Sequence, residues 1–154
     1  EQMYGDKGEV PEGEYVLPIG VADIKKEGKD VTIVSFGKIM KQAMGAAQEL
    51  EKEGISAEVI DLRTIRPIDY ATVINSVKKT NRLVIVEEAW PLGSIATEVT
   101  FKVQKEAFDY LDAPILRVTP ADVPLPYAPT LIDASLPNID RVVKAVKEVM
   151  YVTK

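Results

Sequence analysis

Four short runs of apolar, largely β-branched residues recur along the chain, and a segment with helical periodicity separates each run from the next. The runs cover residues 31–37, 57–62, 82–88 and 115–119. Nearly continuous apolar character is typical of strands that are covered on both faces, as they are in parallel sheets. The alternation of such strands with helices predicts an α/β fold with helices on both faces of a parallel sheet.

The segments between these runs carry recognisable signals for helix ends. Apolar residues recur at helical spacing over residues 39–50, 70–77 and 139–149. The expected end signals are Gly54 as a left-handed residue closing a helix, Asp69 and Asn138 as N-caps, and Gly93-Ser94 as the start of a helix running to about Tyr110. The weakly apolar stretch before residue 26 gives no clear element of its own.

Length and composition indicate one globular domain preceded by a polar segment. Of the 154 residues, 46% are hydrophobic and 28% are charged, which is ordinary for a domain with a core. We expect residues 1–15, rich in Gly, Pro and Glu, to be an inter-domain linker and residues 16–154 to form the domain. The net charge of -5 argues against a nucleic-acid or anionic membrane surface. No apolar run reaches the length of about 18–20 residues that a membrane span needs.

Two absent residue types restrict the chemistry available to the chain. Without cysteine it has no disulfide and no thiolate nucleophile or metal ligand, and without histidine it lacks the commonest general base. We therefore predict no catalytic residue, no cofactor-binding residue and no metal site in this chain.

The stretch DLRTIRPID, residues 61–69, allows two interpretations. Arg63 and Arg66 follow a predicted parallel strand, where α/β sheets bind ligands, and their guanidinium groups suit phosphate. Alternatively, Pro67 interrupts the chain and Asp69 caps the next helix, so that the stretch only connects a strand to a helix. The structural interpretation is favoured.

Two further strand ends carry polar or glycine residues. Gly37 opens a strand-to-helix turn whose amides could hold an anion, but a lone glycine favours a simple tight turn. Glu87 and Glu88 stand beside Trp90, and paired carboxylates can perform acid–base chemistry. No nucleophile or metal ligand accompanies them, so a structural or interface role is favoured.

The proline-rich stretch 120–138 is long for a loop inside a compact domain. Within it, Pro124, Pro126 and Tyr127 belong to a stiff apolar strip, ADVPLPYAPTL. A stiff strip loses little entropy when it docks, which favours a protein interface.

Taken together, the motifs VSFGKIM, EGISAEVIDLRTIRPID, TNRLVIVEEAWP and LDAPILRVTPADVPLPYA resemble the C-terminal domain of pyruvate dehydrogenase β subunits. More broadly they resemble the C-terminal domain of the transketolase superfamily, and the likeness runs from about residue 9 to residue 150. ADVPLPYA favours the pyruvate branch over the branched-chain 2-oxo acid branch. The resemblance implies a three-layer α/β/α domain with a mostly parallel five-stranded sheet and one antiparallel edge strand, around residues 19–25.

The resemblance also implies the surroundings of the domain. The parent would be an α2β2 enzyme that decarboxylates pyruvate and passes the acetyl group to an acetyltransferase core. A preceding pyrimidine-binding domain and the α subunit would hold thiamine diphosphate and magnesium, and this domain would hold neither. Its partners would be that preceding domain, the α subunit, a second β subunit and the core's binding domain. It would lie in the bacterial cytoplasm, or in the mitochondrial matrix of a eukaryote.

Site residues follow from the same resemblance. Docking to the basic binding domain of the core would involve Asp112, Met150 and Tyr151. Contacts between domains or subunits would involve Arg63, Arg66, Glu87, Glu88, Trp90, Pro124, Pro126 and Tyr127. Two competing interpretations are an assembly module without core contact and a free-standing anion or nucleotide binder that uses the Gly37 turn.

Overall fold

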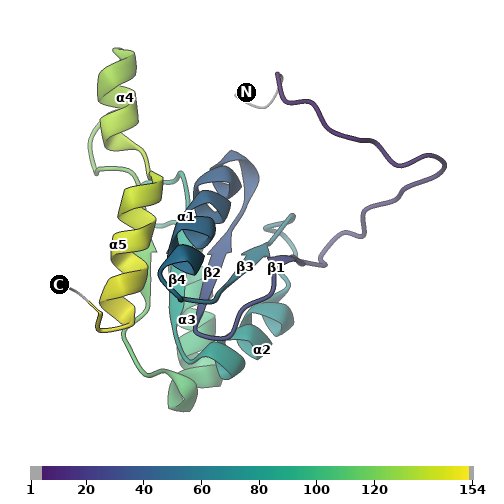
Figure 1. Cartoon of the computed structure of the whole chain (residues 1–154), viewed down its shortest axis with the longest axis vertical. Coiled ribbons are helices and arrows are strands. Elements are labelled where there is room, and N and C mark those ends of the chain that lie inside the picture. Colours follow the sequence, from purple (N-terminus) through teal and green to yellow (C-terminus); the bar gives the residue numbers. More distant parts are fainter. Residues whose placement is uncertain (1–4, 153–154) are drawn as a thin grey trace.

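The structure is a computed structural model that describes residues 5–152, and it contains a five-stranded sheet between two layers of helices (Figure 1). The strands are β1 (Asp23–Lys26), β2 (Val31–Ser35), β3 (Ala57–Asp61), β4 (Leu83–Val86) and β5 (Leu116–Val118). The helices are α1 (Met40–Lys52), α2 (Tyr70–Thr80), α3 (Ile95–Ala107), α4 (Pro129–Ser135) and α5 (Ile139–Val149), with 3-10 turns η1 (Gly37–Ile39) and η2 (Phe108–Tyr110).

The sheet has the strand order β1-β3-β2-β4-β5, and only the β1–β3 pair is antiparallel. The central strands are paired in register, with Ser35 opposite Asp61 on one side and opposite Val86 on the other. All parallel strands therefore end at one edge of the sheet, the carboxyl edge. The predicted three-layer α/β/α fold with one antiparallel edge strand is confirmed.

Two hydrophobic clusters fill the space between the sheet and its helices. One lies against α1 and α5 and contains the fully buried Ile33 and Leu50. The other lies against α2 and α3 and contains the fully buried Ile60 and Ile85. Successive residues of β2 and β3 alternate between the two clusters, because neighbouring side chains of a strand point to opposite faces.

The helix-end signals are confirmed in the structure. After α1, Gly54 has a φ of 82° and its amide donates to Glu51, while the Ile55 amide donates to the Leu50 carbonyl. This is a Schellman motif, in which glycine adopts the left-handed conformation at little cost. Asp69 accepts a hydrogen bond from the Thr72 amide at 3.1 Å, and Asn138 caps α5 in the same way.

The structure corrects two predicted boundaries and adds one short helix. The edge strand expected around residues 19–25 lies at Asp23–Lys26, because residues 20–22 are held by loop contacts: the Gly20 and Ala22 amides donate to Thr64 and Asp69. The helix expected to reach Tyr110 ends at Ala107 and continues as the 3-10 turn η2. The proline-rich stretch contains the short helix α4, which begins at Pro129, a favourable residue for a first helical position.

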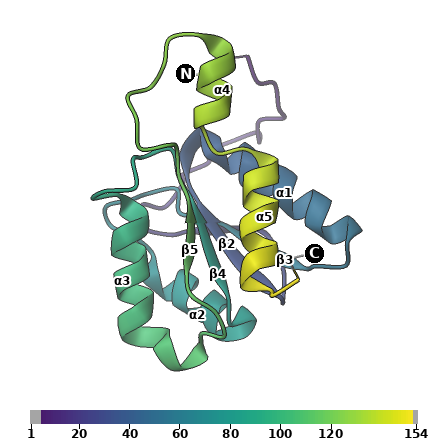
Figure 2. The same ribbon diagram turned by 90° about the vertical axis from the view of Figure 1, so that its left-hand side faces the viewer.

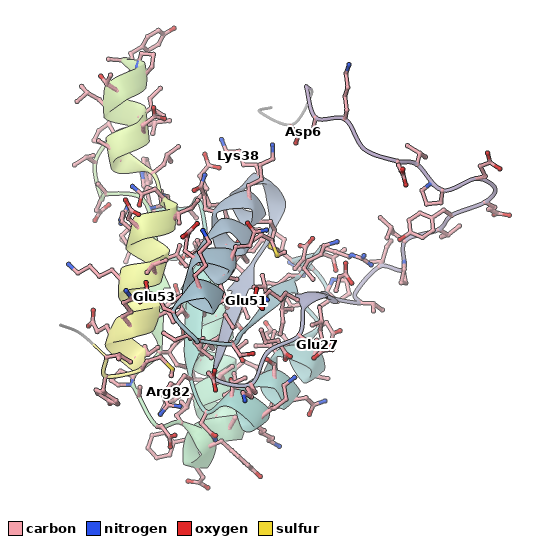
Figure 3. All side chains as sticks on the ribbon, viewed as in Figure 1. Asp6, Glu27, Lys38, Glu51, Glu53 and Arg82 are labelled. Atoms are coloured by element: carbon pink, nitrogen blue, oxygen red, sulfur yellow. The ribbon has the colours of Figure 1, made fainter. Side chains whose placement is uncertain are left out.

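Residues 5–19 form an extended, exposed segment that leaves the body of the domain and turns back near Gly13 (Figure 1). An ion pair of 2.5 Å joins Asp6 to Lys41 on α1, and both Asp6 and Lys38 lie above the carboxyl edge in Figure 3. In the part of the chain that the structure describes, no helix is long and apolar enough to cross a membrane.

Candidate interaction surfaces

The stretch DLRTIRPID forms a connection between β3 and α2 that also fixes the start of β1. Arg63 has a φ of 56°, and its guanidinium donates to Asp23 on β1 at 2.7 Å. Hydrogen bonds from Lys25 and then from Arg63 lower the pKa of the Asp23 carboxyl. The Thr64 hydroxyl donates to the Pro67 carbonyl and accepts from the Gly20 amide. The stretch thus connects β3 to α2 and Asp69 caps α2, as the structural interpretation expects.

The two candidate interface arginines differ in their surroundings. Arg63 is half-buried and engaged within the domain, whereas the Arg66 side chain is exposed at the carboxyl edge. That either arginine contacts another subunit stays a prediction.

Glu87 and Glu88 do not act as a pair, because their side chains have different partners. The Glu87 side chain is fully buried, and its Oε2 accepts from the Ala96 amide at the start of α3, at 3.1 Å. Its Oε1 has no hydrogen-bond partner among the described residues. Glu88 instead forms an ion pair of 2.7 Å with Lys38, in the turn that follows β2. Glu87 caps a helix, and Glu88 supplies a negative charge beside the Gly37 turn.

An apolar groove of about 220 Å³ lies at the carboxyl edge. Its walls come from the end of β4, the proline-rich stretch and the C-terminal end of α4: Glu88, Trp90, Pro120, Ala121, Val123, Leu125, Ser135 and Leu136. The Trp90 side chain is 58% exposed, and Pro124 adjoins it in a smaller depression. Tyr127 is fully exposed and Pro126 is half-buried. Exposed large side chains gathered around a groove are typical of a protein-interaction surface.

The three docking candidates lie at the opposite, amino edge of the sheet, near the C-terminal end of α5. The Arg82 guanidinium Nη2 lies 3.4 Å from the Asp112 Oδ2, and its Nε donates to the Val149 carbonyl at 3.1 Å. Arg82 is labelled at this end of the molecule in Figure 3. The Tyr151 hydroxyl donates to the Asp112 carbonyl at 3.3 Å, and Met150 packs against the core.

The candidate residues therefore fall into two groups, one on each edge of the sheet. The Asp112 carboxylate remains accessible, with a side chain that is 56% exposed, although Arg82 neutralises part of its charge. Tyr151 is 69% exposed, so the amino edge presents an acid and an aromatic ring together. Whether a partner docks there stays a prediction.

Two polar groups of structural importance were not identified from the sequence. The sequence predicts Arg82 only as the start of a strand, since nothing in it places the end of α5 beside this residue. Glu58 is 1% exposed within β3 and accepts hydrogen bonds from Lys79 and from the Gly28 amide. A glutamate inside an apolar run is an available signal for such a buried ion pair.

The described residues do not provide the ligands that a metal–diphosphate cofactor needs. They contain no group of three or more Asp, Glu, His or Cys side chains close enough to hold a metal ion. The turn after β2 could offer amides to a phosphate, but its one cation, Lys38, is already paired with Glu88. We therefore derive no chemical step through thiamine diphosphate or magnesium in this domain.

Comparison with known proteins gives consistent matches. The sequence model of the family described as "Transketolase, C-terminal domain" matches residues 20–142. The pyruvate dehydrogenase E1 component subunit beta of Rhizobium meliloti is 57% identical over 152 residues, which cover 98% of this chain and 33% of that protein. The acetoin:2,6-dichlorophenolindophenol oxidoreductase subunit beta of Cupriavidus necator is 45% identical over 150 residues, which cover 97% of this chain and 44% of that protein. The chain thus spans less than half the length of these relatives.

A solved structure shares the fold over almost the whole chain. It is described as a split gene transketolase in the form of an inactive beta4 tetramer. Its TM-score is 0.79 and its sequence identity is 30%, with 96% of this chain and 47% of that chain covered.

Proposed function

The chain belongs to the transketolase C-terminal domain family, and on that premise we propose that it is the C-terminal domain of the β subunit of a thiamine diphosphate-dependent pyruvate dehydrogenase. The observation that carries the proposal is the 57% identity to such a subunit across 98% of this chain. The parent enzyme would oxidatively decarboxylate pyruvate and transfer the acetyl group to an acetyltransferase core. It would lie in the bacterial cytoplasm, or in the mitochondrial matrix of a eukaryote.

The first role proposed for this domain is assembly with other parts of the enzyme. The groove at the carboxyl edge and the exposed Trp90 and Tyr127 support this role, because isolated domains rarely expose such a surface without a partner. Residues 1–15 are the proposed linker, of which residues 1–4 lie outside the described part of the chain, and Asp6 is joined to Lys41 near the same edge. The proposed partners are a preceding pyrimidine-binding domain, the α subunit and a second β subunit.

The second proposed role is docking to a basic binding domain of the acetyltransferase core. Asp112 supplies a half-exposed carboxylate at the amino edge, and the Tyr151 ring lies next to it. Complementary charge mainly accelerates association and sets the orientation of the partners. Because Arg82 already contacts Asp112, the attraction depends on the part of the carboxylate that Arg82 leaves accessible.

Thiamine diphosphate and magnesium would be bound elsewhere in the parent. When bound, thiamine diphosphate supplies the carbanion-stabilising group on which 2-oxo acid decarboxylation depends. This chain would hold the neighbouring domains in place through its carboxyl edge. Its effect on catalysis would therefore be indirect, through the positions of the domains that bind the cofactor.

Two other enzymes of the same superfamily remain alternatives for the parent. The 45% identity to the acetoin oxidoreductase β subunit favours one of them, and a branched-chain 2-oxo acid dehydrogenase is the other. A free-standing anion binder is disfavoured because the family match covers residues 20–142 and relates the chain to one domain of larger enzyme subunits. Rates with pyruvate, acetoin and a branched-chain 2-oxo acid, measured on the assembled parent, separate the three enzymes.

A domain graft tests the assembly role directly. Residues 16–152 of this chain replace the matching domain of the Rhizobium meliloti β subunit, which is expressed together with its α subunit. We expect a native mass corresponding to α2β2. Trp90→Ala should weaken the tetramer, while Phe101→Ala, a similarly exposed aromatic on α3 at 63%, should not. A folded graft that stays separate from the α subunit would refute the assembly role.

A further inference from the structure

The strand β5 forms one edge of the sheet, and its outer side is open. Its only strand neighbour among residues 5–152 is β4. Figure 2 shows β5 facing the viewer between α3 and α5 with no element over it. A groove of about 270 Å³ runs beside it, lined by Leu116, Arg117, Val118, Arg141, Lys144, Ala145 and Glu148. An open strand edge beside a groove is the geometry in which an extended peptide can add a strand.

The backbone of β5 leaves one residue free for such pairing. The Glu87 amide donates to the Val118 carbonyl, so Val118 faces β4. Carbonyl directions alternate along a strand, which turns the Arg117 amide and carbonyl outward. The next outward carbonyl, that of Thr119, is occupied by the Arg141 guanidinium at 2.6 Å. The free edge is therefore short and centred on Arg117.

The opposite edge of the sheet, β1, is protected against pairing. A register irregularity interrupts β1 between Ile24 and Lys26. Lys25 and Lys26 are both engaged in ion pairs, with Asp23 and Glu51. Irregular pairing and charged side chains are the usual devices by which proteins block an edge strand. β5 shows no irregularity in its pairing with β4.

Charge identifies the kind of peptide that fits the β5 edge. Arg117 and Lys144 are exposed, and neither forms an ion pair with a carboxylate of residues 5–152. The Arg117 guanidinium lies on the α3 side, where it donates to the Pro91 carbonyl at 2.8 Å. Lys144 lies on α5, on the other face of the sheet. Glu148, one turn further along α5, is the single acid of the groove.

From these observations we propose that the β5 edge binds an extended acidic peptide segment of a partner protein by strand addition. Neighbouring residues of a docked strand point to opposite faces of the sheet. Two adjacent acidic residues would therefore reach Arg117 on one face and Lys144 on the other, while the peptide backbone pairs with Arg117. The two cations form a local basic site on a chain whose net charge is -5.

The test is a titration of the whole chain with a seven-residue peptide of Val and Thr that carries a central Asp-Glu pair. Backbone amide shifts from NMR report the site, and a control peptide carries Asn-Gln instead. We expect the chemical-shift changes to centre on residues 116–118. The neutral peptide should bind at least about threefold more weakly, because one exposed charge contact contributes about that much to affinity. Lys144→Gln should weaken binding about threefold, and Lys29→Gln, an exposed lysine near β1, should not.

A pair of variants separates backbone pairing from charge. Arg117→Gln removes the guanidinium only, whereas Arg117→Pro also removes the outward amide, a change that edge strands tolerate. Arg117→Pro should bind the peptide more weakly than Arg117→Gln, with melting temperatures showing that both are folded. Equal binding of the acidic and neutral peptides, shifts away from β5, or a dimer of the chain that already protects β5 would each overturn the proposal.

Discussion

Arg82 and Asp112 form an ion pair, with 3.4 Å between Nη2 and Oδ2, that ties the start of β4 to the loop before β5. The same guanidinium donates to the Val149 carbonyl, near the C-terminal end of α5. One side chain therefore positions both parts of the proposed docking surface. Arg82 fixes the surface without needing to contact a partner.

Arg82→Gln should destabilise the domain and loosen the end of α5. The variant loses the charged hydrogen bond to Val149, which we expect to cost about 1–2 kcal/mol of the free energy of unfolding in urea. Hydrogen exchange of the amides of residues 149–152 should accelerate. Asp112→Asn is the control, because it keeps the Arg82–Val149 bond and should cost less. An equal loss of unfolding free energy in Arg82→Gln and Asp112→Asn would contradict the stabilising role given to the Arg82–Val149 hydrogen bond.

Asp112→Ala should raise the dissociation constant for the basic binding domain of the core by about tenfold, equivalent to roughly 1.4 kcal/mol. Calorimetry on the assembled parent at low salt measures the change. Removing residues 152–154, of which the structure describes only Val152, should leave binding unchanged or stronger. Wild-type binding by Asp112→Ala would show that the docking surface lies elsewhere.

The fold could be predicted from the sequence because strands buried on both faces of a parallel sheet are nearly continuous runs of apolar residues. The four apolar runs became the parallel strands, and Asp69, Asn138 and Gly54 ended helices as expected from their own chemistry. Helix α4 was not predicted, because prolines dominate its surroundings and the stretch is short. The edge strand began later than expected, since Thr64 and Asp69, more than 40 residues away, hold the preceding amides.

The site was less predictable because its geometry depends on contacts between distant residues. Glu87 and Glu88 are neighbours in sequence, yet one caps α3 and the other pairs with Lys38. The Arg63 guanidinium pairs with Asp23, 40 residues away, a contact within the domain that the sequence does not indicate. The candidate residues lie on two opposite edges of the sheet, an arrangement that depends on the tertiary structure and that no local sequence pattern indicates.

Glu58 should make the domain sensitive to acid. Its burial alone would raise the carboxyl pKa, but hydrogen bonds from Lys79, Ser76 and the Gly28 amide outweigh burial and hold the pKa below its ordinary value of 4.5. A lowered folded-state pKa stabilises the protein above pH 4.5, and this stability is lost as the pH falls through the folded-state pKa. Urea unfolding between pH 7 and pH 3 measures the effect.

Glu58→Gln should flatten the part of this pH dependence below pH 4.5. It should also lower stability at pH 7, because Lys79 loses its buried charged partner and keeps only the exposed Glu27. Glu49→Gln, which removes an exposed carboxylate paired with Lys52, is the control and should follow the wild-type curve. An acid profile of Glu58→Gln identical to that of the wild type would exclude Glu58 as the source of the sensitivity.

Deleting residues 1–12 should leave the melting temperature almost unchanged. Residues 5–12 are exposed, and among the described residues of this segment the one ion pair is that of Asp6 with Lys41. An exposed pair contributes at most about 1 kcal/mol, which corresponds to a shift of about 2–4 °C. Lys41→Gln in the full chain isolates that contribution. A larger loss on deletion than in Lys41→Gln would mean that the segment packs on the domain.

In the function proposed above, this domain contributes assembly to a pyruvate dehydrogenase and no chemistry of its own. The most direct measurement is acetyl transfer or dye reduction by the purified 154-residue chain with pyruvate, thiamine diphosphate and magnesium. We predict the cofactor-only rate, because the chain has no histidine and its described residues hold no metal-binding cluster. Turnover above that rate that persists through further purification would contradict the claim.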